Sequence, residues 1–271
     1  MLGKLIKHDL RATWKVAVSL DAVQIVLGIM TAIMIYFVPH VGESFGMGLF
    51  MFSFIGVFYI GIIAANIITL IFLVIRYYRN LYTSEGYLTF TLPVKTDMII
   101  HSKVITGSVW MLLSYVCTII AILTVGLGFI SNLDVPRDEI GAAFSEIYTV
   151  MGFADPGFAA VLVFLILLTP VAGVLCMYFC ISIGQLWSGH KVLGSVLCVV
   201  GLYIINQIVS QVIFMISGFW NMMSSSGADI DATFGLMYKN TMLILGIVTL
   251  IQAVIYYVVC IFIARKKINL D

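Results

Sequence analysis

The stretch RYYRNLYTSEGYLTFTLPVKTDMIIHSK, residues 76–103, is polar and basic, and a strongly apolar run lies on each side of it. A connection between two helices of a bundle needs only about two to eight residues. This one is long enough for two short helices, broken at Gly86 and Pro93. It also carries several tyrosines: Tyr77, Tyr78, Tyr82 and Tyr87. We therefore expect residues 76–103 to form a docking segment outside the membrane.

The composition excludes an ordinary soluble domain. Of the 271 residues, 62% are apolar and only 10% are charged, whereas soluble domains carry roughly a quarter charged residues. A span needs about 20 apolar residues in a helix, and within residues 16–264 six runs qualify. We expect an all-α integral membrane protein, with a kink at Pro170 and spans at Val16–Val38, Met47–Ile75, Val104–Ile130, Phe158–Ile183, Val192–Gly218 and Thr241–Ala264.

Residues 1–15 form an amphipathic pattern before the first span. Leu2, Leu5 and Leu10 recur at helical spacing, while Lys and Arg side chains fill the opposite side. Such a helix lies flat among lipid headgroups. A signal peptide is the alternative, but the apolar run is too long for one and no small-residue cleavage site follows it.

The basic residues are distributed unevenly between the two sides of the membrane. Lys and Arg accumulate on the cytoplasmic side of membrane proteins. With the N-terminus inside, twelve of the fourteen lie there, and only Arg137 and Lys239 lie outside. We expect both termini, the 76–103 segment and the tail 265–271 to be cytoplasmic, and residues 131–157 and 219–240 to be external.

The external segment 131–157 contains a second amphipathic pattern. Pro136 marks a helix start, with Asp138 and Glu139 in the first turn. Two interpretations stay open: a helix resting on the outer face of the bilayer, or a lid over an outward-opening cavity. The other external segment, 219–240, is too polar to cross the membrane.

Polar side chains inside the spans have two interpretations. They are either hydrogen-bonding partners between helices or the lining of a substrate path. Gln24, Asn66 and Gln252 lie in the first, second and sixth spans, and Asp21 is the only charge inside a span. The candidates for a path are Asn66 and a stripe in the fifth span: Tyr203, Asn206, Gln207, Ser210 and Gln211.

The sequence contains no recognisable catalytic, metal or cofactor motif. There is no GxxxxGK[ST] phosphate loop and no HExxH, and the four histidines lie far apart on different segments. We expect no enzyme activity, no catalytic residue, no metal and no cofactor in this chain, and no nucleic-acid partner.

A block within the docking segment resembles a known family. Residues 76–81, RYYRNL, lead to EGYLTFTLPV at 85–94. Together with six spans and a basic N-terminal helix, this block is similar to the permease subunits of bacterial type-2 ABC exporters. The resemblance is to Firmicutes permeases associated with antimicrobial-peptide or lantibiotic export and immunity. It implies a bacterial plasma-membrane protein that pairs with a second permease, identical or a related paralogue.

The resemblance also implies that residues 76–103 hold a coupling helix seated in a groove of a separate ATPase subunit, which would bind ATP and Mg²⁺. Gly86 would give the backbone freedom for a sharp entry, and Glu85 would pair with a basic group on the groove's rim. Thr96 with Asp97 would cap a new helix running into the third span. The expected ATPase contacts are Arg79, Glu85, Gly86, Tyr87, Leu88, Phe90, Leu92 and Pro93.

Two alternatives to coupling stay open. In the first alternative, the 76–103 segment lies on the membrane surface with its aromatic side chains among headgroups. In the other, the chain is a non-transporting scaffold or sensor whose loop docks a cytoplasmic signalling partner. An exporter permease, by contrast, requires an ATP-binding protein that co-purifies with the chain.

Overall fold

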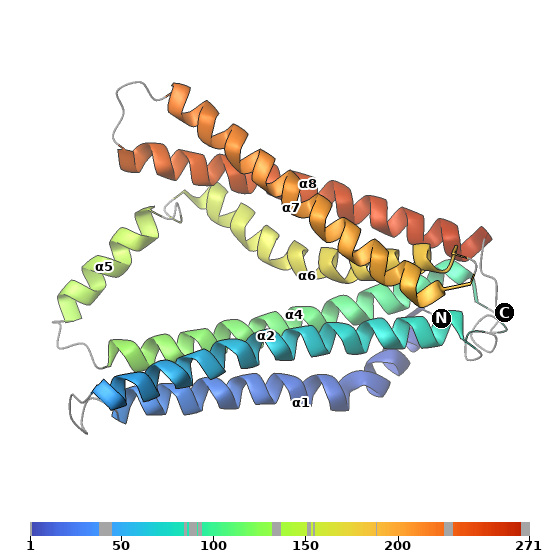
Figure 1. The fold of residues 1–271 in the computed structure, drawn as a ribbon, viewed down its shortest axis with the longest axis horizontal. Coiled ribbons are helices and arrows are strands. Elements are labelled where there is room, and N and C mark those ends of the chain that lie inside the picture. Colours follow the sequence, from blue (N-terminus) through green and yellow to red (C-terminus); the bar gives the residue numbers. More distant parts are fainter. Residues whose placement is uncertain are drawn as a thin grey trace. The chain divides into compact units, whose positions relative to one another are not determined.

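A computed structural model describes residues 2–37, 45–83, 86, 91, 94–131, 137–150, 153, 155–187, 189–224 and 230–266. These residues form helices joined by turns and bends, with no strand among them (Figure 1). The chain divides into two compact units, residues 1–134 (unit 1) and 135–271 (unit 2).

Six helices are long and apolar enough to cross a membrane, which confirms an all-α, multi-pass membrane protein. The seventh described helix, α5, has 14 residues and is too short to span. The spanning helices are α1 (Leu2–Phe37), α2 (Phe45–Tyr82), α4 (Thr96–Ile130), α6 (Pro156–Gly184), α7 (Lys191–Ser224) and α8 (Ile230–Lys266), and α5 covers Arg137–Val150.

The helices extend well beyond the apolar runs that predicted them. Residues 76–82 continue α2 rather than forming a separate short helix, and residues 2–15 continue directly into the first span as part of α1. Likewise α7 reaches Ser224 and α8 begins at Ile230, which shortens the expected 219–240 connection. Apolar runs mark only the length that a hydrocarbon core requires, whereas helical hydrogen bonding continues past the ends of these runs.

In unit 1, α1 packs along α4, and α2 contacts both helices. The buried face of α1 consists mostly of small or polar residues: Asp9, Thr13, Ala17, Asp21, Gln24, Gly28, Thr31 and Ile35. A Cβ on Gly28 would lie 3.0 Å from the Ala121 backbone of α4, so the two backbones approach closely. Small residues at contacts of this kind allow membrane helices to pack by dispersion and hydrogen bonding.

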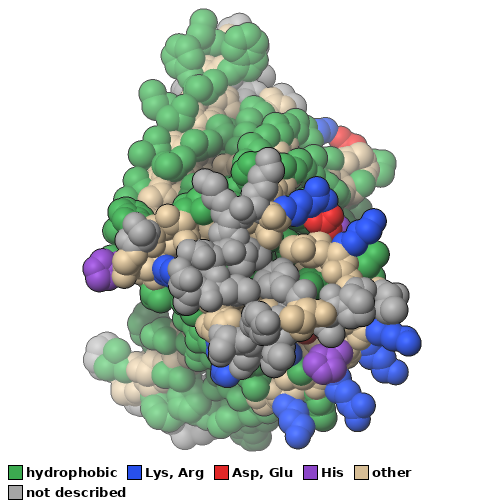
Figure 2. Space-filling model, turned by 90° about the vertical axis from the view of Figure 1, so that its right-hand side faces the viewer, with side chains coloured by type: hydrophobic (Ala, Val, Ile, Leu, Met, Phe, Trp, Pro, Cys, Tyr) green, Lys and Arg blue, Asp and Glu red, His purple; other side chains and the backbone are tan. Residues whose placement is uncertain are grey.

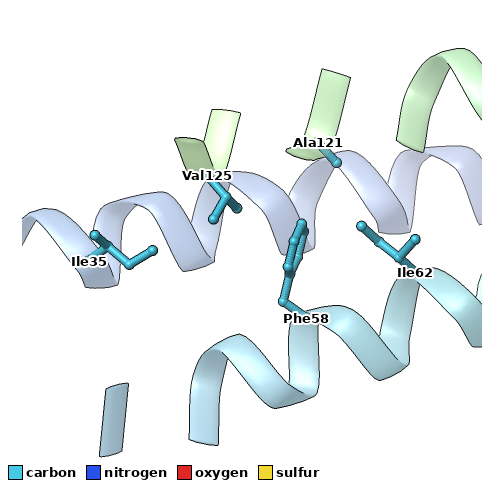
Figure 3. Close-up of a cluster of buried hydrophobic side chains, with 5 residues drawn as sticks. All are labelled: Ile35, Phe58, Ile62, Ala121 and Val125. Carbon is cyan, nitrogen blue, oxygen red and sulfur yellow. The ribbon is translucent and has the colours of Figure 1, made fainter. Parts of the chain in front are cut away.

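An apolar cluster completes the packing of unit 1. Figure 3 shows Phe58 and Ile62 of α2 pointing toward the other helices, where they meet the remaining three members. All five side chains of the cluster are buried: Ile35, Phe58, Ile62, Ala121 and Val125. They fix the position of α2 beside the α1–α4 pair.

In unit 2, α6 packs against both α7 and α8, and α7 contacts α8. Pro170 is buried inside α6, and Figure 1 shows α6 changing direction along its length, as a missing backbone donor predicts. At its C-terminal end, Gly184 comes very close to the start of α7, where a Cβ would lie 2.5 Å from the Ser195 amide nitrogen. Gly189, between the two helices, has a φ of 108°, which L side chains rarely adopt.

The Gly184 contact makes a stability prediction. Gly184→Ala should lower the free energy of unfolding by about 2 kcal/mol, because the new methyl group cannot avoid the α7 backbone. Gly173→Ala is the matched control on the same helix, since nothing lies within 4 Å of its Cβ position. Thermal unfolding in detergent measures both variants. Equal melting temperatures for the two would contradict the close approach.

Candidate functional site

The docking segment, residues 76–103, consists of the end of α2, the connection after it and the start of α4. Only part of the connection is described. Arg79 lies exposed near the end of α2, and the Gly86 amide donates to the Thr83 carbonyl oxygen at 2.8 Å. α4 begins at Thr96 with Lys95 at the N-cap position, so the expected cap at Thr96 is wrong, and Asp97 lies in the first turn of the helix. The remaining expected ATPase contacts lie outside the described residues: Glu85, Tyr87, Leu88, Phe90, Leu92 and Pro93.

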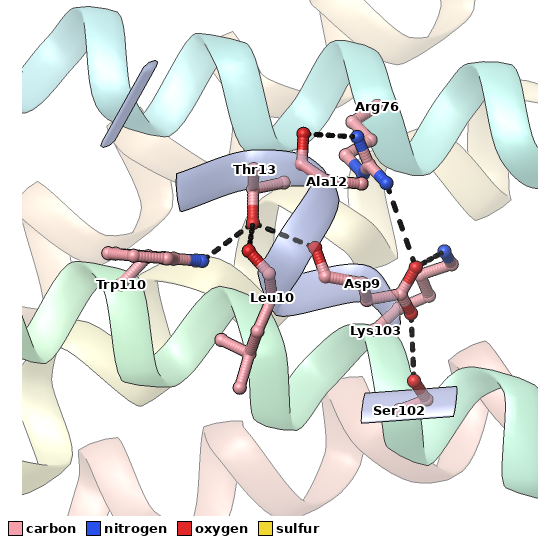
Figure 4. Close-up of polar contacts among 8 residues, drawn as sticks. All are labelled: Asp9, Leu10, Ala12, Thr13, Arg76, Ser102, Lys103 and Trp110. Atoms are coloured by element: carbon pink, nitrogen blue, oxygen red, sulfur yellow. Dashed lines mark hydrogen bonds and ion pairs between the residues drawn. The ribbon is translucent and has the colours of Figure 1, made fainter. Parts of the chain in front are cut away.

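A cluster around Asp9 connects the helices on both sides of the docking segment (Figure 4). Lys103 of α4 donates to Asp9 Oδ1 at 2.6 Å, and the Ser102 hydroxyl donates to Oδ2 at 2.8 Å. Arg76 of α2 approaches Oδ1 at 3.8 Å and donates to the Ala12 carbonyl oxygen at 3.4 Å. The side chain of Asp9 is 9% exposed and that of Lys103 11%. This Asp9 cluster is therefore largely shielded from solvent.

The contact between α1 and α4 continues one turn further along. Thr13 is fully buried; its hydroxyl accepts from the Trp110 indole nitrogen at 2.7 Å and donates to the Asp9 carbonyl oxygen at 2.9 Å. A Thr hydroxyl bonded to the carbonyl four residues earlier commonly bends a helix. In Figure 1 the first turns of α1 run at an angle to the rest of that helix.

The Asp9 cluster was not predicted from the sequence. The sequence predicts that residues 1–15 lie flat among lipid headgroups, with their lysines toward anionic lipid and Trp14 at the boundary. Instead Asp9 and Thr13 pack on α4, whereas the basic side chains of the segment, such as Lys7 and Arg11, are exposed. The available signal was the recurrence of polar and small residues at helical spacing along α1, which is how membrane helices form contacts.

A second polar group connects α1, α2 and α4 of unit 1. Gln24 of α1 donates to the Ser114 hydroxyl at 3.1 Å and accepts from the Thr118 hydroxyl at 2.8 Å. Asn66 of α2 donates to that Thr118 oxygen at 3.0 Å. Asn66, one of the candidate path residues, thus takes part in helix–helix bonding, although its own Oδ1 has no partner among the described residues.

Asp21 differs from Asp9 because neither of its carboxylate oxygens has a hydrogen-bond partner in the described part of the chain. It is 4% exposed. Ser114 and Cys117 of α4 are neighbours of the carboxyl group. The Ser114 hydroxyl, however, forms no hydrogen bond with either oxygen. A carboxyl group within a span, buried and unpaired, is expensive to maintain and marks a candidate functional position.

The polar stripe of α7 divides into two groups. Asn206 accepts from the Gln252 amide of α8 at 2.9 Å, and Ser210 is half-buried. Gln207, Gln211 and Tyr203 are exposed, Tyr203 by 69%. Helix–helix bonding therefore explains Asn206, while the exposed residues keep the path hypothesis open.

This division makes a second stability prediction. Asn206→Leu should cost about 1 kcal/mol of stability, because it leaves the Gln252 amide without its acceptor. Gln207→Leu, on the neighbouring exposed position, should leave the melting temperature unchanged. Unfolding of both variants in one detergent measures the difference. If Gln207→Leu is the more damaging change, the assignment of Asn206 as the bonded residue is wrong.

At the start of α6, Asp155 caps the helix and pairs with α8. Its carboxylate accepts from the Gly157 amide at 3.0 Å and forms an ion pair with Lys239. The hydrogen bond from Lys239, followed by that from Gly157, holds the pKa of Asp155 below its ordinary value. Lys239 also lies over the Phe158 ring, 5.7 Å from its centroid. Arg137 and Lys239 are the two cations expected outside, and the second of them is paired.

No described group of three or more His, Cys, Asp or Glu side chains has the geometry of a metal site. The cysteines in the described chain are free thiols within the helices. No family model, curated protein or solved structure matches this sequence. The classification of the chain therefore rests on its six spanning helices. This is an all-α, multi-pass membrane protein.

Proposed function

We propose that this chain is the membrane permease subunit of an ATP-driven exporter in a bacterial plasma membrane. In this proposal a separate ATPase subunit binds residues 76–103, and a second permease completes the complex. The EGYLTFTLPV block at 85–94 and the excess of Lys and Arg on one side of the spans support it. The substrate class suggested by the resemblance is an antimicrobial peptide or another amphipathic compound.

The observation that carries the proposal is the Asp9 cluster. Arg76 lies near the end of the helix that enters the docking segment, and Lys103 lies near the start of the helix that leaves it. Both contact the same carboxylate oxygen of α1. A displacement of the segment would therefore move α1, α2 and α4 together, which is the mechanical requirement for turning partner binding into conformational change.

The proposal has a direct test at the level of the whole complex. The full chain, extracted from its native membrane in a mild detergent, should co-purify with an ATP-binding protein in fixed proportion. ATP hydrolysis by that complex should depend on this chain. Co-purification of a signalling protein with no ATPase activity would favour the scaffold or sensor alternative instead.

A further inference from the structure

A cavity of about 510 Å³ lies between α1, α2 and α4 in unit 1. Its charged and polar lining includes His8, Asp9, Arg76, Arg79 and Lys103. Its remaining wall is mainly apolar and includes Leu5, Phe72, Ile75 and Ile99. The volume is within the range of small-molecule binding sites in proteins, roughly 300–1,000 Å³.

The charges of this cavity favour an anion. Among the described residues of the lining, Arg76, Arg79 and Lys103 are cations and Asp9 is the one carboxylate. Both Asp9 oxygens already accept hydrogen bonds, from Ser102 and Lys103. Lys, Arg and His side chains are also prominent on the face of the molecule that Figure 2 shows. Among the described lining residues, cations therefore outnumber carboxylates.

Arg76 has the donors that such an anion needs. A guanidinium presents five N–H groups in a planar fork that fits phosphate with two parallel hydrogen bonds. The contacts of Arg76 with Asp9 and Ala12 are both long, 3.8 Å and 3.4 Å. Its side chain is 24% exposed, so the group is neither fully bonded nor fully solvated.

The position of the cavity matches the headgroup layer of a bilayer. Its lining comes from residues 5–9, 72–80 and 99–103, which lie at the ends of the apolar runs of α1, α2 and α4. Basic pockets between membrane helices at this depth bind anionic lipid headgroups. The apolar wall offers a surface for the first part of an acyl chain.

We propose that this cavity binds the phosphate group of an anionic phospholipid, with Arg76 as the main contact and Lys103 and Arg79 beside it. A soluble phosphate compound has the same chemistry and is the other source to distinguish. The site does not depend on the export function. Because Arg76 also belongs to the Asp9 cluster, a bound lipid would lie against the helices that hold the docking segment.

Native mass spectrometry of the full chain tests the site. Phosphatidylglycerol and phosphatidylcholine with identical acyl chains are added separately in detergent, and the retained lipid is counted. We expect wild type to retain phosphatidylglycerol in preference. Arg76→Gln should weaken that retention about tenfold, as the loss of a charge-assisted hydrogen bond predicts. Arg11→Gln, an equal charge change at an exposed position of α1 outside the cavity, should leave retention unchanged.

A second variant distinguishes loss of the Arg76 contact from general misfolding. Asp9→Asn removes the competing carboxylate, so it should strengthen retention of phosphatidylglycerol even while it weakens the fold. Inorganic phosphate and glycerophosphoglycerol are then added as soluble competitors. If either displaces the lipid at equal concentration, the ligand is a soluble phosphate bound at the same site. Equal retention of the two lipids by wild type, or equal losses in Arg76→Gln and Arg11→Gln, would overturn the proposal.

Discussion

Asp9→Asn should lower the free energy of unfolding by about 3 kcal/mol, the loss typical when one member of a buried ion pair is removed. The variant leaves Lys103, only 11% exposed, without its closest counter-ion at 2.6 Å. Arg76 loses its ion pair as well. Because the cluster is shielded, added salt should screen this effect much less than it would at the surface. SDS-induced unfolding in mixed micelles measures the difference.

Asp138→Asn is the matched control, since it makes the same change at an exposed position of α5 and should have little effect. A double variant isolates the pair. The double variant Asp9→Leu with Lys103→Met should lose less stability than the two single variants lose together, by a coupling energy of about 2 kcal/mol. Additive losses would mean that the two side chains do not interact.

Asp21→Leu should have the opposite effect and raise the free energy of unfolding by about 2 kcal/mol. The reason is that the Asp21 carboxyl is buried with neither oxygen bonded to a described partner, and an unpaired buried polar group costs about this much. Asp21→Asn should fall between wild type and Asp21→Leu, because it removes the charge and keeps the polar group. The same SDS titration compares the three proteins.

The control for Asp21→Leu is Ser19→Leu, an exposed position of α1 whose hydroxyl bonds only to the Val16 carbonyl oxygen. It should leave stability unchanged. If Asp21→Leu is instead destabilising, the carboxyl has a partner outside the contacts described for unit 1. If Asp21→Leu stabilises the protein but abolishes ATPase coupling, Asp21 is required for function at a cost in stability.

The six spans were predictable because hydropathy is a local property. Each run holds the roughly 20 apolar residues that a bilayer demands. The helices α2, α4, α6, α7 and α8 contain five of the runs, and α1 contains the first up to Phe37. The helix from Pro136 was predictable for a similar reason, and α5 begins at Arg137 with Asp138 and Glu139 in its first turn. Helix ends were less predictable, because backbone hydrogen bonding does not stop where the apolar residues stop.

The polar contacts could not be predicted, because pairing is a non-local property. In the sequence Asp9 lies more than ninety positions before the adjacent residues Ser102 and Lys103. Polar and small residues recur at helical spacing along α1, but this spacing does not indicate that Asp9 meets Ser102 and Lys103 of α4. The same holds for Gln24 with Ser114 and for Asn206 with Gln252: the sequence singled out Gln24, Asn206 and Gln252 as polar side chains inside spans but did not name their partners.

The rate of ATP hydrolysis by the purified complex tests the central claim most directly, because that claim places the ATPase contact in residues 76–103. The test variant is Glu85→Arg with Tyr87→Ala. The control makes the same two changes at the same spacing in α5, Glu146→Arg with Tyr148→Ala, where both side chains are exposed. We expect the first pair to weaken ATPase binding at least about tenfold, as loss of an interface anchor does, and the rate to fall with it. The control should hydrolyse ATP like wild type. Equal rates and equal assembly in all three proteins would contradict the account.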